Sequence, residues 1–192
     1  MNTKRVGLFF TFMVLACFTS LSFANEVQTQ KLWSAAQSDS LEGVKDALSK
    51  GAKLTKREGS SLVHIAIRNR NTEMLHVLLK YGAEVNFQSR NVLAPLFIVS
   101  RIGYEPMVKV LLAYGADVNL VNRLNQTALM YAAHNGHSHI VKILLAHGAD
   151  KSIVSVRDKT ALQIALERGY VNVVNLLVSD EDLRDLHAPL VK

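Results

Sequence analysis

The side chains best suited to metal binding or covalent chemistry in this 192-residue sequence are one cysteine and a group of histidines. Cys17 is the only cysteine and lies near the amino terminus. Four histidines occur close together, at His134, His137, His139 and His147, and imidazole is a common zinc ligand. No thiolate or carboxylate joins them at the spacing of a metal motif, so we expect neither a metal nor another cofactor.

The motifs that usually mark an enzyme are missing from the sequence. There is no glycine-rich loop to hold a phosphate, no sharp turn around a nucleophilic serine and no paired metal-ligand motif. We therefore expect the chain not to be an enzyme.

Residues 1–24 have the layout of a secretory signal peptide. Lys4 and Arg5 precede an apolar stretch over residues 6–18, and Ser22 and Ala24 provide small side chains where a signal peptidase reads them. This layout predicts cleavage after Ala24 and export to the periplasm, or secretion. The mature chain would then carry no cysteine, and hence no disulfide, thiolate zinc site or catalytic thiol.

Two other interpretations of this segment stay open. An uncleaved membrane anchor requires about twenty consecutive apolar residues, and the run over residues 6–18 is shorter. A lipoprotein would be lipidated at Cys17, although Leu15 and Phe18 depart from the usual motif. The mature chain is expected to contain no transmembrane segment.

Two sequence motifs recur along the rest of the chain. Leu-Leu-x-x-Gly-Ala begins at Leu78, Leu111 and Leu144, at intervals of 33 residues, and a weaker copy begins at Leu48. A second apolar motif lies upstream of each copy. Its opening residues are Leu32, Val63, Leu96, Leu129 and Leu162, and the first four stand 19 positions before the glycine of a Gly-Ala pair. Two motifs in fixed phase indicate a repeat protein.

This pattern resembles the ankyrin repeat from about Lys31 to Val178, with residues 122–150 nearest to the family pattern. The resemblance implies an all-α solenoid of five helix-turn-helix repeats with projecting β-turn fingers. The expected organisation is a signal peptide over 1–24, an N-terminal capping repeat over 25–58, repeats two to five over 59–178, and a C-terminal cap and tail over 179–192, with a short helix near 183–187. The resemblance also implies structural roles for His64, His137 and His147.

Local chemistry supports helices that cover one another. The stretches 107–112 and 140–145 are so apolar that neighbouring helices must cover them on nearly all sides. The glycines that follow the second helices, at positions 51, 82, 115 and 148, suit a left-handed terminating residue. The turn between repeats two and three departs from the ankyrin pattern. Val92 stands where that pattern usually has glycine, and Ala94 where it usually has threonine. We expect that turn to take another shape or to be strained.

The resemblance implies recognition without catalysis, with partner contacts on the turns and the first helices. Repeats two to five are aligned on the residue at the threonine position of each one, which is Ser61, Ala94, Thr127 or Thr160. This alignment selects the following partner-binding residues: Arg57, Arg68, Arg90, Leu93, Arg101, Ile102, Arg123, Leu124, His134, Arg157 and Arg168. The same positions include Glu58, Ser60, Asn69, Gln88, Asn91, Val121, Gln126, Asn135, Val154, Val156, Lys159 and Glu167.

These positions carry eight basic and two acidic residues, although the mature chain has a net charge of only +4 once Lys4 and Arg5 are removed. They hold seven of the nine mature arginines but only one of the eleven mature lysines. Because arginine grips carboxylates through two parallel hydrogen bonds, we expect a protein partner that presents acidic groups.

Three alternatives accompany this expectation. The same face could bind an anionic polymer or a membrane surface, or its arginines could simply be solvated. No aromatic ladder accompanies the arginines, so nucleic acid is not expected. The chain is expected to be a monomer.

Overall fold

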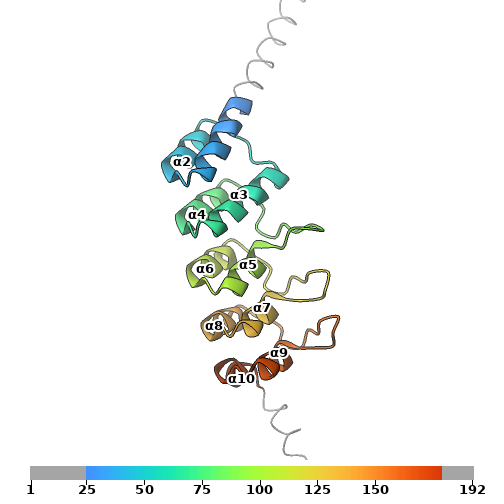
Figure 1. Ribbon diagram of the computed structural model, residues 1–192. Helices are drawn as coiled ribbons and strands as arrows, with labels where there is room; N and C mark the ends of the chain where they lie inside the picture. Colours follow the sequence, from blue (N-terminus) through green and yellow to red (C-terminus); the bar gives the residue numbers. More distant parts are fainter. Residues whose placement is uncertain (1–24, 179–192) are drawn as a thin grey trace, which may run out of the picture. The chain divides into compact units, whose positions relative to one another are not determined.

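The computed structural model describes residues 25–178, except for the side chains at positions 56 and 57. The regular secondary structure of this part is helical (Figure 1). The predicted signal peptide and the predicted C-terminal cap, with its short helix near 183–187, lie outside the described residues. The chain divides into two compact units with the boundary between Ala83 and Glu84.

The first unit contains a helix over residues 25–37, α2 (Leu41–Ser49), α3 (Lys56–Arg68) and α4 (Thr72–Lys80). Its core is apolar, and Leu32, Val44, Leu62 and Leu75 are completely buried. The turns between paired helices are tied together by Asp39, whose Oδ1 accepts hydrogen bonds from the side chains of Asn69 at 3.3 Å and Asn71 at 3.0 Å.

The start of α3 corrects one expectation. Residues 57–60 were predicted to form a projecting turn before Ser61, but they are the first turns of this helix. Thr55 and Glu58 form a capping box, in which each side chain satisfies the backbone N–H of the other, so the helix begins at Lys56. The predicted boundary between residues 58 and 59 therefore lies inside α3.

The second unit is made of helix pairs whose members lie in two layers. The first layer contains α5 (Pro95–Ile102), α7 (Ala128–His134) and α9 (Ala161–Arg168), and the second contains α6 (Glu105–Ala113), α8 (Ser138–Ala146) and α10 (Val171–Leu177). Helix α7 packs between α5 and α9, and α8 packs between α6 and α10. Each pair therefore buries its apolar side chains against the next one, as the repeat pattern predicts.

The core of this unit follows from the recurring apolar motifs. Leu96, Met107, Leu129 and Ile140 are at most 2% exposed. The glycines at positions 51 and 82 of the first unit, and those at 115 and 148 of this unit, all have positive φ, between 78° and 92°, which confirms their predicted role. The stretches 107–112 and 140–145 are covered less completely than expected, because Val110, Leu112, Ile143 and Leu145 stay partly exposed.

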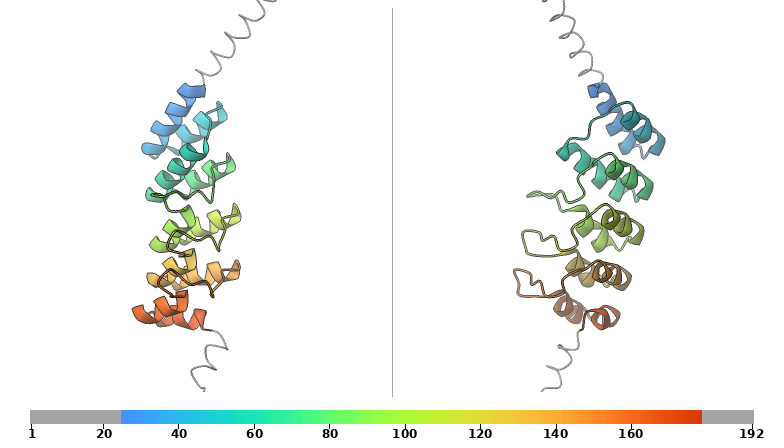
Figure 2. Two further views of the ribbon diagram at one scale, coloured as in Figure 1. Left: turned by 90° about the vertical axis from the view of Figure 1, so that its right-hand side faces the viewer. Right: turned by 180° about the vertical axis from the view of Figure 1, so that it is seen from behind.

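Asparagine side chains connect successive repeats of the second unit. Asn119 Nδ2 donates to the carbonyl of Gly148 at 3.1 Å, and Asn119 Oδ1 accepts from the N–H of Asp150 at 2.8 Å. Asn86, one repeat earlier, makes the same pair of bonds to Gly115 and Asp117. These bonds fix the start of the projecting loops that begin at Asp117 and Asp150, and the loops extend from one side of the helices (Figure 2).

Candidate partner-binding site

Three projecting loops of the second unit form the candidate site. We call them the α5 finger (residues 84–94), the α7 finger (117–127) and the α9 finger (150–160), each named after the helix that follows it. The α7 finger closes through Asn122, whose Oδ1 accepts from the N–H groups of Leu124 at 2.8 Å and Gln126 at 3.0 Å. Asn125 then adopts the left-handed conformation, with a φ of 52°.

The α9 finger closes in a similar way. The N–H of Ser155 donates to the carbonyl of Lys159 at 3.0 Å, and the hydroxyl of Ser155 accepts from the N–H of Arg157 at 3.4 Å. Asp158 takes the left-handed position, with a φ of 52°. Asparagine and aspartate tolerate this conformation better than other non-glycine residues, so both turns agree with their sequences.

The α5 finger has the different shape that its sequence predicts. Its turn closes one residue earlier, through a hydrogen bond of 2.9 Å from the N–H of Ser89 to the carbonyl of Val92. Among residues 25–178, Val92 is not one of the non-glycine residues with positive φ. The turn thus avoids the conformation that a β-branched side chain resists.

Hydrogen bonds hold neighbouring fingers together. Gln88 Nε2 donates to the carbonyl of Val121 at 3.0 Å and joins the α5 and α7 fingers. The N–H of Val156 donates to the carbonyl of Leu124 at 2.9 Å, and Asn125 Nδ2 donates to the carbonyl of Val154 at 2.6 Å. The finger tips therefore form a continuous, braced surface within this unit.

Four predicted arginines lie exposed on this surface or near it. Arg90, Arg123 and Arg157 belong to the three fingers, and Arg101 lies in the last turn of α5. Within the described part of the chain, none of the four lies within 4 Å of a carboxylate. Their guanidinium groups consequently keep their hydrogen-bonding capacity for water or for a ligand.

Several other charged groups of the second unit are already paired or hydrogen-bonded. Lys159 and Glu167, both among the predicted contact positions, form an ion pair at 2.6 Å. Lys109 pairs with Glu105 at 2.6 Å, and its hydrogen bond lowers the pKa of that carboxyl. Hydrogen bonds from the adjacent Ser152 likewise lower the pKa of the Asp150 carboxyl.

Arg168 differs from the four exposed arginines because it has a partner. Its guanidinium contacts Nε2 of His134 across α7 and α9. Since guanidinium can only donate, His134 accepts through Nε2 and the ring proton is assigned to Nδ1. Both side chains are exposed at the predicted positions, and this contact occupies Nε2 of His134 and one N–H group of Arg168.

Apolar side chains lie among the arginines, as predicted. Ile102 is 37% exposed, Leu124 50% and Val156 60%, whereas Leu93 is half-buried. Isolated exposed apolar residues are common on protein surfaces. Here they share the fingers and the adjoining helix end with unpaired guanidinium groups, an arrangement that suits a protein ligand.

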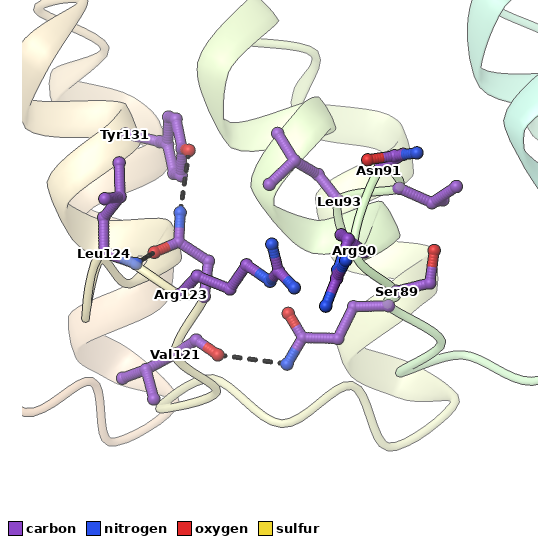
Figure 3. A pocket seen from close by; sticks show the side chains of 11 residues that line it. Ser89, Arg90, Asn91, Leu93, Val121, Arg123, Leu124 and Tyr131 are labelled. Carbon is purple, nitrogen blue, oxygen red and sulfur yellow. Dashed lines mark hydrogen bonds between the residues drawn. The ribbon is translucent and has the colours of Figure 1, made fainter.

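A pocket of about 560 Å³ opens between the α5 and α7 fingers (Figure 3). It is lined by Gln88, Ser89, Arg90, Asn91, Val92, Leu93, Val121, Asn122, Arg123, Leu124 and Tyr131. Sequence reasoning selected the arginines and leucines but missed Asn122 and Tyr131. The sequence gives a signal only for Asn122, because asparagine commonly begins turns.

The first unit contributes fewer usable positions than expected. Arg68 is exposed in the last turn of α3, whereas Asn69 is engaged with Asp39. Ser60, expected on a turn, is 1% exposed inside α3, and Glu58 is bound in the capping box with Thr55. The backbone of Arg57 is helical, so it does not lie on the predicted turn.

Two of the histidines join successive repeats, and a third contacts its own helix. His137 and His139 contact through Nε2 the carbonyls of Arg101 at 3.0 Å and Gly103 at 3.2 Å, on the preceding pair of helices. His147 contacts the carbonyl of Ile143 at 2.9 Å. No group of three or more potential metal ligands occurs in residues 25–178.

A protein-family model for ankyrin repeats, in its three-copy form, matches residues 32–122 and again residues 96–186. The chain belongs to the ankyrin repeat family. Ankyrin repeats are generally protein–protein interaction modules without catalytic activity. A search of curated proteins returned no match. Over the described residues, no helix of this ankyrin chain is both long enough and apolar enough to cross a bilayer.

Proposed function

We propose that the protein is an exported, non-catalytic module that binds an acidic protein partner through the arginines of its second unit. One observation carries this proposal. Arg90, Arg101, Arg123 and Arg157 are exposed without a carboxylate partner in the described chain, on or beside fingers that hydrogen bonds brace.

A guanidinium group gains a strong interaction from a carboxylate. Two parallel, charge-assisted hydrogen bonds form in a fixed geometry, and arginine is among the residues that dominate binding energy at interfaces. The braced fingers limit the entropy lost on binding because the backbone is already ordered. A partner with acidic residues in a row would therefore bind with defined orientation.

The alternative is an anionic polymer or a membrane surface, and the apolar residues between the arginines favour a protein over the polymer. Leu124 and Val156 gain nothing from a uniformly charged chain but contribute when apolar side chains cover them. A polyanion would show a steep dependence on salt and little dependence on its own chemistry.

Export rests on residues 1–24. Expression of the full chain in a Gram-negative host, followed by cell fractionation and amino-terminal sequencing, tests it. Appearance of a chain that begins at Asn25 in the periplasm or medium supports export. Retention of Lys4 and Arg5 on a cytoplasmic chain would contradict it.

The binding proposal is tested by affinity capture from periplasmic and secreted extracts. The variant reverses Arg90, Arg101 and Arg123 to glutamate. A matched control reverses three exposed lysines outside the predicted contact positions, Lys31, Lys53 and Lys142, and so changes the net charge equally. We expect one protein to be captured by the wild type and the control and lost by the arginine variant. Equal capture by all three forms would place recognition elsewhere.

A further inference from the structure

The pocket between the α5 and α7 fingers brings two positive charges together. Arg90 comes from one finger and Arg123 from the other, and Figure 3 shows their side chains pointing toward one another across the pocket. Neither has a carboxylate within 4 Å in the described residues. Two like charges that converge repel each other, and an anion between them removes that repulsion.

Apolar groups and a hydroxyl surround this positive centre. Leu93 and Leu124 line the same pocket, one from each finger, and Leu124 is half exposed. Tyr131 rises from α7 beside them (Figure 3). The pocket thus combines a site for an anion with a site for an apolar side chain. Its volume of about 560 Å³ lies within the range of clefts that enclose ligands.

The hydrogen bonds around Tyr131 leave one donor for a ligand. Asn122 Oδ1 accepts from two backbone N–H groups, so the orientation of its amide is fixed and Nδ2 must donate. Nδ2 donates to the Tyr131 hydroxyl at 3.0 Å. The hydroxyl is the acceptor in that bond and its own proton is left to donate to a further acceptor.

We propose that this pocket is a subsite for one short segment of the protein partner, in which a glutamate or aspartate stands next to a large apolar residue. The carboxylate bridges Arg90 and Arg123, and the apolar side chain covers Leu93 and Leu124. This assignment rests on the proposed function and specifies the chemistry of one part of the binding surface.

A peptide fits the lining better than a polyanion does. A polyphosphate or nucleic acid carries a charge on every unit and would leave Leu93 and Leu124 without an apolar partner. A peptide segment carries charged and apolar side chains together, so it can supply a carboxylate to the two arginines and an apolar group to the two leucines of the same pocket.

The test uses protein purified after expression of the full chain and fluorescein-labelled octapeptides. One peptide alternates Glu with Leu. The second has Gln in place of every Glu, and the third has Ser in place of every Leu. Fluorescence anisotropy measures their dissociation constants, and polyphosphate is added as a competitor. The protein variants are R90Q with R123Q, L124S, and the charge-matched control K53Q with K142Q.

We expect the Glu–Leu peptide to bind at least about tenfold more tightly than the Gln–Leu peptide, the difference that one charge-assisted contact provides. It should bind several-fold more tightly than the Glu–Ser peptide, which has no apolar side chain to cover the leucines. R90Q with R123Q should weaken its binding about tenfold or more, and L124S should weaken it several-fold, whereas the lysine control should bind like the wild type. Unchanged thermal unfolding of each variant shows that the fold is retained.

The subsite is overturned if the Gln–Leu peptide binds as well as the Glu–Leu peptide, or if the arginine variant binds normally. It is also overturned if polyphosphate binds more tightly than the peptides regardless of L124S, which would assign the surface to polyanions. Arginine-dependent capture of a partner without binding of any octapeptide would reject the subsite and keep the proposed function. If neither partner capture nor octapeptide binding depends on the arginines, both the subsite and the proposed function are rejected.

Discussion

The hydroxyl of Tyr131, on helix α7, accepts a hydrogen bond of 3.0 Å from Nδ2 of Asn122 in the finger that precedes that helix. The other atom of the same amide, Oδ1, closes the finger turn by accepting from two backbone N–H groups. One side chain therefore shapes the turn and fixes it against the helix. The position of the pocket, and of Arg123 beside Asn122, depends on this link.

We predict that Asn122→Ala destabilises the protein by about 1–3 kcal/mol, because the substitution leaves backbone donors of the turn without their acceptor. Tyr131→Phe removes only the bond to the helix and should cost about 0.5–1.5 kcal/mol. The free energy of unfolding of both variants is measured by urea denaturation, with circular dichroism as the signal. A smaller effect for Asn122→Ala than for Tyr131→Phe would show that the turn does not depend on this side chain.

A second prediction concerns two glycines with the same backbone conformation. Gly103 and Gly169 have φ values of 73° and 72°, but a Cβ at Gly103 would lie 2.6 Å from the ring of His137, whereas none of the described atoms lies within 4 Å of one at Gly169. Gly169→Ala should destabilise the protein by only about 1 kcal/mol, because alanine disfavours the left-handed conformation. Gly103→Ala should cost about 1–3 kcal/mol more because the imidazole must move.

The difference between the two alanine variants, measured by urea denaturation, isolates the steric contact between successive repeats. If both variants lose the same stability, the imidazole of His137 can move aside without loss. The account of repeat packing around that histidine would then be wrong.

A third prediction concerns Ser100, which is completely buried in α5. Its hydroxyl has no hydrogen-bond partner in the described part of the protein. Ala133 occupies the corresponding position one repeat later and is equally buried. Burial of an unsatisfied hydroxyl is unfavourable by about 1–3 kcal/mol, so Ser100→Ala should leave stability unchanged or raise it by up to that amount.

Thermal and urea unfolding of Ser100→Ala provide the measurement, with Thr127→Ala as the contrasting variant. Thr127 is also buried, at 2% exposure, but its hydroxyl caps α7 by accepting from the N–H of Met130 at 3.3 Å. Its loss should cost about 1 kcal/mol. Clear destabilisation by Ser100→Ala would show that its hydroxyl is satisfied in solution.

Much of this fold could be predicted from the sequence because its signals are local and repeated. The Gly-Ala motifs mark the ends of the second helices, and Val92 correctly predicts an unusual turn, since a β-branched side chain resists positive φ. The start of α3 was missed because the contact positions were placed only by the family spacing from Ser61, whereas the capping box of Thr55 and Glu58 begins the helix at Lys56. That choice placed Ser60 and Arg57 on a turn that does not exist.

The candidate site was predictable by position but not by pairing. The sequence shows where Arg90, Arg123 and Arg168 stand in their repeats, and only the structure shows that Arg168 contacts His134 whereas the other two face one pocket. Tyr131 and Asn122 were missed because their bond joins a loop to a helix. Such contacts depend on the three-dimensional path of the chain and leave no periodic signal.

The central claim is that the unpaired arginines of the second unit hold an acidic partner. The most direct measurement is the dissociation constant of the captured partner for three proteins: the wild type, the variant with Arg90, Arg101 and Arg123 reversed to glutamate, and the control with Lys31, Lys53 and Lys142 reversed. We predict that the arginine variant binds at least about a hundredfold more weakly, because charge reversal replaces attraction by repulsion, and that the control binds within about threefold of the wild type. Equal weakening by both variants, or by neither, would contradict the account.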